Sequence, residues 1–341
     1  MTNYPWKSAG ICLFSPHHDE VDRFCGFVKN TLAADGIDTI VMIIRYNFNF
    51  ASHPECIGDY PLTKEDVRKM VAACRECGIN LIPDMNLLGH QTVQDSHAPD
   101  GLLRGHPEFC ETPIEEEPEY SYSLCPNAPG LYEVVCDLID EIADAFEATD
   151  FHIGVDEVFY IGLCDRCKGQ DPGDLLAAWV TKLHDYLAAK GIRMLMWGDR
   201  LLDSRACGHG PWDASMNGTH TALGKIPTDI VITDWHYHNW PRFPSVEVFA
   251  EAGHRIWLCP FNVAENAKLF LDYAKEHDRG NIIGIMETTW TPVSYLMDGL
   301  EGKELVDDGK WYKGSTPHIV RCYKSIFRPD EPWDEVPQEE E

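Results

Sequence analysis

The feature that most constrains the fold of this chain is a regular alternation of short apolar, β-branched runs with longer amphipathic segments. Runs with strand composition lie at 11–14, 39–45, 80–85, 150–153, 194–197, 230–234, 254–258 and 281–286. Segments with helical periodicity lie between them at 19–34, 63–77, 130–147, 173–189, 245–252 and 264–277. Strands that alternate with helices in this way predict the α/β class and, with eight strand candidates, a single-domain (β/α)8 TIM barrel.

Turn and capping residues mark several ends of these segments. Thr63, with Asp66 three residues later, is typical of a helix N-cap, and Gly78 follows the last helical residue of the same segment. The connection between 197 and 230 has little helical pattern, and an open doubly wound sheet is the alternative architecture. We assign residues 1–328 to the barrel and residues 329–341 to an acidic C-terminal tail.

The longest insertion, residues 89–129, follows the third predicted strand. In a parallel barrel, the segments that follow the strands lie together on the face that carries the active site. We therefore expect this insertion to shape a substrate cleft.

Charge and cysteine content exclude some classes of partner. The chain has 56 acidic and 28 basic residues, a net charge of −28, which argues against nucleic acid or an anionic membrane surface as a partner. Its apolar runs are much shorter than the ~18 residues of a membrane span. The first residues lack a signal-peptide pattern, and the thirteen cysteines are odd in number, so we expect a reduced, cytoplasmic protein. Nothing in the sequence indicates an oligomeric state.

Polar and aromatic residues gather directly after the predicted strands. Because the carboxyl ends of barrel strands meet at one mouth, these side chains are expected to line one cleft. Tryptophan rings stack on the apolar faces of sugar rings, while carboxylates and imidazoles bind hydroxyl groups or transfer protons. This combination predicts a sugar-binding cleft. The candidate residues are Arg45, His90, Asp156, Glu157, Trp197, Trp235, Glu287 and Trp290.

The segment DFHIGVDEV, residues 150–158, places Asp156 and Glu157 side by side at the end of a buried strand. Two neighbouring carboxylates repel each other, so we expect the pKa of one of them to be raised. A raised pKa is what a general acid needs near neutral pH.

HIGVDEV resembles the HxGxDE signature of glycoside hydrolase family 20, the β-N-acetylhexosaminidases. Segments 62–90, 194–202, 229–238 and 284–290 are similar to other parts of that family in the same order, over roughly residues 36–292. Bacterial single-domain members with a CxxC motif after the acidic pair are similar too, because GLCDRC follows here at 162–167. The resemblance implies an amino-sugar glycan or glycoconjugate as substrate.

The resemblance also implies a retaining exo-mechanism in which the 2-acetamido oxygen of the substrate attacks the anomeric carbon and gives an oxazolinium ion. Glu157 would act as general acid and base, and Asp156 would orient the acetamido group. His90 would support Glu157 through a polar network. The mechanism needs no cofactor or catalytic metal. The residues that would enclose the acetamido methyl group and the sugar ring are Trp197, Trp235 and Trp290.

Three departures from the family pattern affect recognition of the sugar hydroxyls. SPHHDE at 15–20 replaces a segment with an arginine, Pro292 replaces a glutamate, and the segment 258–262 lacks a clear tyrosine and aspartate. Arg45 and Glu287 are the substitutes that we predict. The choice between GlcNAc and GalNAc stays open at this point.

Other functions are compatible with parts of the sequence. A two-carboxylate retaining β-glycosidase would use Glu157 and Glu287, and a sugar-binding barrel would use the same cleft without catalysis. The HHDE string at 17–20 is similar to a metal-binding segment of zinc-dependent deacetylases. A structural zinc site built from Cys164, Cys167, Cys207 and His209 is the alternative to free buried cysteines.

Overall fold

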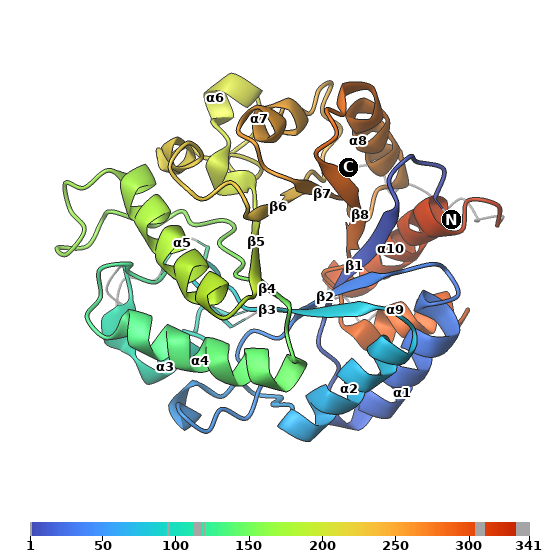
Figure 1. The fold of residues 1–341 in the computed structure, drawn as a ribbon, viewed down its shortest axis with the longest axis horizontal. Helices are drawn as coiled ribbons and strands as arrows, with labels where there is room; N and C mark the ends of the chain where they lie inside the picture. Colours follow the sequence, from blue (N-terminus) through green and yellow to red (C-terminus); the bar gives the residue numbers. More distant parts are fainter. Residues whose placement is uncertain (1, 94–95, 112–117, 119, 304–310, 332–341) are drawn as a thin grey trace.

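The computed structural model describes residues 2–93, 96–111, 118, 120–303 and 311–331, with side chains from residue 316 in the last range. Its centre is a closed barrel in which each strand pairs in parallel with the next and β8 pairs with β1 (Figure 1). This confirms the predicted (β/α)8 barrel. The strands are β1 Ser8–Phe14, β2 Thr39–Ile43, β3 Asn80–Asp84, β4 Asp150–His152, β5 Arg193–Trp197, β6 Val231–Trp235, β7 Ile256–Cys259 and β8 Ile282–Thr288.

Helices surround the barrel in Figure 1, and the long ones begin and end near the predicted positions. They are α1 Val21–Phe27, α2 Lys64–Glu76, α4 Leu131–Phe146, α5 Pro172–Ala189, α7 Ser245–Glu251 and α8 Ala264–His277. The first is shorter than predicted because a π-helical turn, Val28–Leu32, takes over its end. At α2, the Thr63 hydroxyl accepts a hydrogen bond from the Asp66 backbone, which confirms the predicted N-cap.

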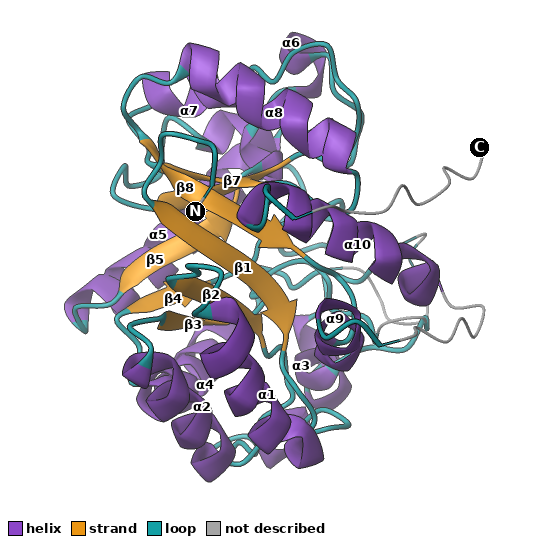
Figure 2. Cartoon of the chain, turned by 90° about the vertical axis from the view of Figure 1, so that its right-hand side faces the viewer, coloured by secondary structure: helices purple, strands orange, loops and turns teal. Residues whose placement is uncertain are grey.

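The sequence analysis missed the short α3, Gly101–Gly105, and two helices after the last strand, α9 Val293–Leu300 and α10 Trp311–Phe327. The sequence between α9 and α10 contains glycines and acidic residues, and Pro317 lies inside α10. The helical pattern of the sequence after β8 is therefore weak. Figure 2 shows α10 at the side of the barrel, where it packs against α8 and α9.

The connection from β5 to β6 contains only short helical turns, as its weak pattern predicts. These are Asp199–Leu201, α6 Ser204–Cys207 and Thr219–Ala222. Residues 332–341 of the predicted acidic tail lie outside the described residues, so the boundary at 328 stays a prediction.

The core has two parts, because successive residues of a strand point to opposite faces. A large cluster fills the space between strands and helices. A smaller one fills the inside of the barrel and includes Trp197, Trp235 and Met286. The tryptophans therefore point inward at the ends of β5 and β6, which brings them to the mouth of the barrel.

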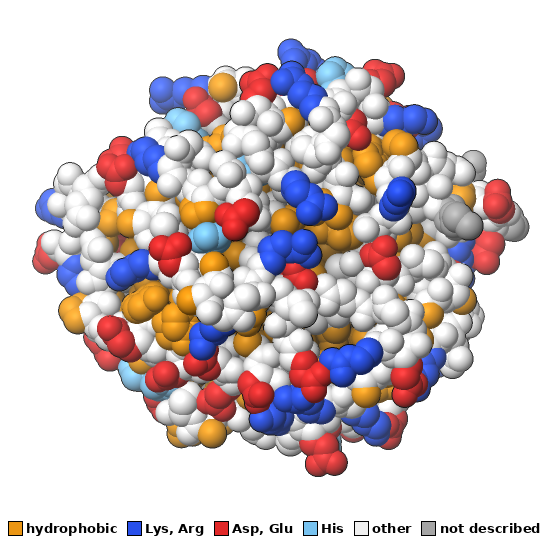
Figure 3. Space-filling view, in the orientation of Figure 1, with side chains coloured by type: hydrophobic (Ala, Val, Ile, Leu, Met, Phe, Trp, Pro, Cys, Tyr) orange, Lys and Arg blue, Asp and Glu red, His pale blue; other side chains and the backbone are white. Residues whose placement is uncertain are grey.

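None of the described helices combines the length and the apolar character of a membrane span. Figure 3 shows acidic, basic and uncharged side chains interspersed on the face that it displays. The cytoplasmic location and the exclusion of nucleic acid stay predictions.

Candidate active site

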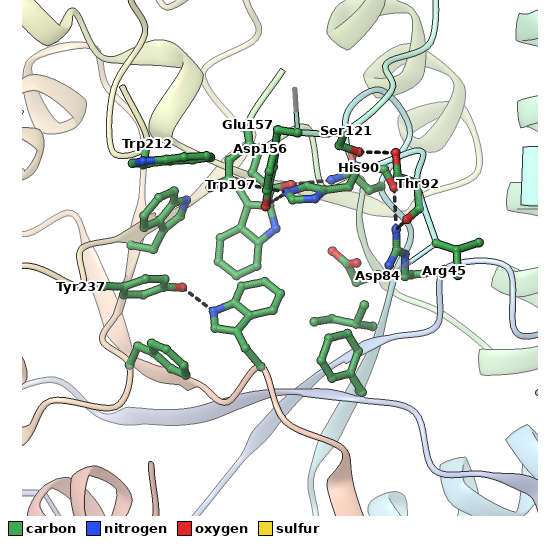
Figure 4. A pocket seen from close by; sticks show the side chains of 18 of the residues that line it. Arg45, Asp84, His90, Thr92, Ser121, Asp156, Glu157, Trp197, Trp212 and Tyr237 are labelled. Carbon is green, nitrogen blue, oxygen red and sulfur yellow. Dashed lines mark hydrogen bonds and ion pairs between the residues drawn. The ribbon is translucent and has the colours of Figure 1, made fainter. Parts of the chain in front are cut away.

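A cavity of about 680 Å³ opens among the segments that follow the strands (Figure 4). Besides His90, the 89–129 insertion contributes Thr92, Val93, Ser96, His97, Tyr120 and Ser121 to its wall. The insertion thus lies where the barrel architecture predicted. The other lining residues are Phe14, Ile43, Arg45, Asp84, Asn86, His90, Asp156, Glu157, Trp197, Trp212, Trp235, Tyr237, His238, Phe261 and Trp290.

One imidazole joins the two adjacent acids. The Nε2 atom of His90 lies 3.1 Å from Oδ2 of Asp156 and 3.0 Å from Oε2 of Glu157. The amide of Asn86 donates a hydrogen bond to the other oxygen of Asp156. The Asp156 side chain is 9% exposed and that of Glu157 is 13% exposed, so both carboxylates sit in a largely dry site that still opens to the cavity.

The backbone at this site adopts strained conformations. Six non-glycine residues in the described part of the chain have positive φ, and four of them line the cavity: Arg45, His90, Glu157 and Trp290. A fifth, Val155, precedes Asp156. Left-handed backbone costs an ordinary residue about 1–3 kcal/mol and is concentrated at functional sites. The folded barrel therefore holds these side chains in positions that a relaxed loop would not give them.

Two glycines allow the loops around the acids to approach each other. A Cβ atom at Gly89 would lie 2.4 Å from the carbonyl oxygen of Asp156. A Cβ atom at Gly154 would lie 2.6 Å from the Cα atom of Asn86, and its φ of +67° also favours glycine. Gly89 and Gly154 thus allow the loop that carries His90 to lie close to the loop that carries the acidic pair.

Electrostatics at the site favour a charged pair between His90 and Asp156. Burial opposes a charge on His90, but Asp156 and Glu157 outweigh it and raise the pKa of His90 to about 10. For Asp156, burial is likewise outweighed, by the charge and hydrogen bond of His90, and its pKa is lowered. The sequence analysis expected mutual repulsion to dominate, and at Asp156 the imidazolium reverses that effect.

Asp199 is a buried carboxylic acid that supports the backbone of Glu157. Its Oδ2 atom accepts hydrogen bonds from the backbone N–H of Glu157, at 2.9 Å, and from Nε of Arg200, at 2.6 Å. Burial raises the pKa of Asp199 to about 6, against the lowering effect of Arg200, and the nearby charges of the acidic pair act in the same direction as burial.

Aromatic side chains form much of the cavity wall. Trp197, Trp235 and Trp290 all line it, as the sequence predicted. Nε1 of Trp290 donates a 2.8 Å hydrogen bond to the hydroxyl of Tyr237, which also lies 3.0 Å from Oγ1 of Thr288. These contacts fix the Tyr237 hydroxyl at the cavity wall.

Arg45 lines the cavity but is already bound to the insertion. One terminal nitrogen of its guanidinium donates to the carbonyl oxygens of His90, at 2.5 Å, and Thr92, at 2.9 Å. Arg45 therefore holds the loop that carries His90, in addition to facing the cavity.

Glu287 requires a correction, because it does not line the cavity. Met286 belongs to the cluster inside the barrel, so the next residue along β8 points outward. The Glu287 side chain is completely buried and faces Cys322 of α10, and burial raises its pKa well above the ordinary value. Glu287 is thus separated from Glu157 by the wall of the barrel, and it cannot share a substrate with it.

Five aromatic residues of the cavity wall were not predicted from the sequence: Phe14, Tyr120, Trp212, Tyr237 and Phe261. Tyr120 and Trp212 come from loops without periodicity, and their rings lie 5.0 Å apart. Both also pack on Phe159, which is not part of the cavity wall. Tyr237 was recognisable in principle, because it follows Trp235 by two residues and shares its face of the strand.

Possible metal ligands gather in three groups among the described residues. One is the set His90, Asp156 and Glu157, and another is a surface set of His53, Glu55 and His106. The third, Glu111, Cys125, Cys164 and Cys167, contains the CxxC motif.

Two metal-ligand sets that the sequence analysis considered as alternatives are not assembled among the described residues. Cys207 and His209 do not join the CxxC motif, and the Nε2 atom of His209 instead lies 3.2 Å from the carbonyl oxygen of Arg242. In the HHDE string, the ring of His17 stacks on Tyr60, and none of its four residues belongs to a group of possible metal ligands among the described residues.

We expect His90→Gln to lower the free energy of unfolding near pH 6 by about 3–5 kcal/mol, because it leaves two buried carboxylates without their cation. The pKa of His90 is raised from 6.5 to about 10 in the folded state, so its contribution is complete below pH 6.5 and is lost as the pH rises through 10. Denaturant titrations at pH 6, 8 and 10 should show the difference from wild type shrinking. The exposed His17, replaced by Asn, is the control, and a difference independent of pH would contradict the charge assignment.

The chain is similar in sequence to known proteins. Residues 45–299 match the sequence family described as glycosyl hydrolase family 20, catalytic domain. Over 275 residues the chain is 23% identical to the lacto-N-biosidase of Bifidobacterium bifidum, an alignment that covers 72% of this chain and 22% of that protein. It is 25% identical over 275 residues to the beta-hexosaminidase of Porphyromonas gingivalis, covering 68% of this chain and 34% of that protein. The chain thus corresponds to a minor part of the length of both relatives.

Solved structures share the fold. The crystal structure of the β-N-acetylhexosaminidase from Bacteroides fragilis superimposes with a TM-score of 0.65 at 14% identity, over 92% of this chain and 66% of that one. At this identity the likeness shows a common barrel fold.

Proposed function

Because the chain belongs to glycosyl hydrolase family 20, we propose that it is a retaining β-N-acetylhexosaminidase that removes terminal GlcNAc or GalNAc from glycans or glycoconjugates. The observation that carries the proposal is the imidazole of His90 between Asp156 and Glu157, 3.1 and 3.0 Å away, in a cavity lined by tryptophans. The relatives named beta-hexosaminidase support the same activity.

In the first step, the acetamido oxygen of the substrate attacks the anomeric carbon while Glu157 donates a proton to the leaving glycosidic oxygen. The C–O bond to the aglycone breaks, and a cyclic oxazolinium ion forms. Asp156 accepts a hydrogen bond from the acetamido N–H and stabilises the positive charge that develops there. His90 and Asn86, which bind the two oxygens of Asp156, keep that carboxylate in place.

In the second step, Glu157 acts as a base. It removes a proton from water, which attacks the anomeric carbon and reopens the oxazolinium ring with net retention of configuration. Asp199 supports this change of role, because it fixes the backbone of Glu157 through a 2.9 Å hydrogen bond.

The aromatic wall gives the substrate its place. We assign the apolar faces of Trp197, Trp235 and Trp290 to the acetamido methyl group and the sugar ring. Tyr120 and Trp212 lie at the rim of the cavity, where Trp212 is 42% exposed. We assign these two side chains to an aglycone or a second sugar.

The two alternative functions have less support. A double-displacement enzyme that used Glu157 and Glu287 needs both carboxylates at one anomeric carbon, and Glu287 faces α10 instead. A binding barrel without catalysis has no need of two acids clamped by one histidine in a strained loop. The proposal therefore rests on Glu157 and Asp156 as the catalytic pair.

A panel of aryl β-glycosides tests the proposed activity. We expect turnover of the GlcNAc and GalNAc glycosides, competitive inhibition by a thiazoline that mimics the oxazolinium ion, and no comparable turnover of glucosides or galactosides. Equal turnover of the sugars without an acetamido group would favour double displacement. No turnover of any glycoside would favour a binding protein.

We expect the GalNAc glycoside to be cleaved at a rate at least comparable to that of the GlcNAc glycoside. One terminal nitrogen of the Arg45 guanidinium is held by two backbone carbonyl groups, and Glu287 is outside the cavity, so the carboxylate that was predicted to select an equatorial O4 is missing from the site. The measurement is kcat/KM for the two aryl glycosides. A GalNAc value more than a hundredfold below that of GlcNAc would contradict the prediction.

A further inference from the structure

Four side chains capable of binding a metal converge outside the sugar cavity, between the loop that follows β3 and the loop that follows β4. They are Glu111, Cys125, Cys164 and Cys167, and a ligand atom of each lies within 4.8 Å of those of the others. The Sγ atom of Cys125 is 3.5 Å from that of Cys164 and 3.3 Å from that of Cys167. We propose that these four side chains bind a structural Zn²⁺ ion.

The spacing of the sulfur atoms fits a tetrahedral metal site. With Zn–S bonds of about 2.3 Å, sulfur atoms at the corners of a tetrahedron lie about 3.8 Å apart. The observed separations are close to that value and well beyond a disulfide bond of about 2.05 Å. A disulfide would also use only two of the three thiols. Three cysteines and one carboxylate complete the closed set of four ligands that structural zinc sites use.

Glu111 is oriented for this role by the backbone of the neighbouring loop. Its side chain is completely buried, and Oε1 accepts hydrogen bonds from the backbone N–H groups of Leu163, at 2.7 Å, and Cys164, at 3.1 Å. The second oxygen, Oε2, lies 3.5 Å from the sulfur of Cys164. This oxygen lies at the edge of the thiol cluster, where a bound cation would pair with the buried carboxylate.

Hydrogen-bond donors and a cation surround the sulfur atoms of the cluster. The carbonyl of Cys164 accepts a 3.0 Å hydrogen bond from the backbone N–H of Cys167, which closes the CxxC turn. The amide of Asn127 donates to the sulfur of Cys167, at 3.5 Å. The guanidinium of Arg166 is fixed by two backbone carbonyl groups and interacts with the sulfurs of Cys125 and Cys164. Such donors and cations around the ligands stabilise a metal–thiolate site.

The ion would join two loops that serve the cavity. Tyr120 and Ser121 precede Cys125 and line the cavity, and Glu157 precedes the CxxC motif on the next loop. A bond network across both loops would fix their relative positions independently of substrate.

Metal content tests the proposal directly. We expect protein purified without chelators from cells supplied with zinc to contain one zinc ion per chain, measured by elemental mass spectrometry. After removal of zinc, added Co²⁺ should give the intense visible bands of a tetrahedral ion and thiolate-to-cobalt charge transfer in the near ultraviolet. Wild-type protein should lose thermal stability with a strong chelator and regain it with Zn²⁺.

Variants show whether the four proposed ligands, and not cysteines elsewhere in the chain, bind the metal. Cys125→Ser should lose zinc and most of the charge-transfer absorbance. Glu111→Gln should keep that absorbance but release the metal faster to a chelator. Cys207→Ser, which removes a half-buried thiol outside the cluster, should retain zinc and is the control.

Several results would overturn the proposal. One is wild-type protein that contains no zinc and gives no thiolate–cobalt spectrum, a result that does not depend on the folding of any variant. Another is full zinc content in Cys125→Ser. A third is a disulfide between any two of Cys125, Cys164 and Cys167, detected by peptide mapping of the unreduced protein.

Discussion

Replacing Glu157 by Gln is expected to cut turnover by about two to four orders of magnitude on substrates with poor leaving groups, the usual effect of losing a general acid. The amide has nearly the same shape, so His90 keeps a partner at that position and the fold is retained. Activated aryl glycosides should lose much less activity, because their leaving groups need little protonation. The measurement is kcat/KM for a series of glycosides whose leaving-group pKa increases.

The slope of this series carries the conclusion. For Glu157→Gln, log(kcat/KM) should fall steeply with the pKa of the leaving group, whereas the wild type should be nearly flat. Glu251→Gln, at an exposed ion pair with Arg279, should behave like the wild type. An equal loss on all substrates would remove Glu157 from the role of acid.

Replacing Asp156 by Asn is expected to lower kcat by about 10²–10³ with little change in KM. The asparagine side chain has the same shape, and its oxygen can accept a hydrogen bond from either Asn86 or His90, so the side chain keeps its position although one of the two contacts is lost. The negative charge opposite the forming oxazolinium ion is lost, a charge-assisted contact that we place at roughly 2–4 kcal/mol in a dry site. Because the charge acts only as the ion forms, the loss falls on the transition state.

Chemical rescue separates this role from that of a nucleophile. Azide should not convert Asp156→Asn into an enzyme that makes an α-glycosyl azide, since no enzyme nucleophile has been removed. With Glu157→Ala, azide should instead give the β-glycosyl azide by attack on the oxazolinium ion. A covalent adduct trapped on Asp156 by a 2-fluoro sugar would contradict substrate assistance.

Much of the fold follows from local patterns in the sequence. The eight strands are evident because each is a short buried run, and the helices between them have clear amphipathic periods. Barrel topology then brings residues after different strands to one mouth. This explains why His90, Asp156 and Trp197 could be grouped although they are far apart in sequence.

The errors have equally physical reasons. Strand β8 is buried on both faces, so its sequence shows no alternation that would reveal the outward direction of Glu287. Tyr120 and Trp212 lie in loops whose paths depend on tertiary contacts. Cys125 is 39 residues from Cys164, and no local pattern connects it to the CxxC motif.

The left-handed backbone at Arg45, His90, Glu157 and Trp290 has a consequence for protein engineering. At each of these positions, glycine or asparagine would adopt the left-handed backbone at lower cost. Selection for thermal stability alone would therefore favour variants in which these residues are replaced. The same replacements would remove the side chains that form the cavity. Thermostable variants of this barrel should therefore be selected with a simultaneous screen for glycosidase activity, or with these four positions held fixed.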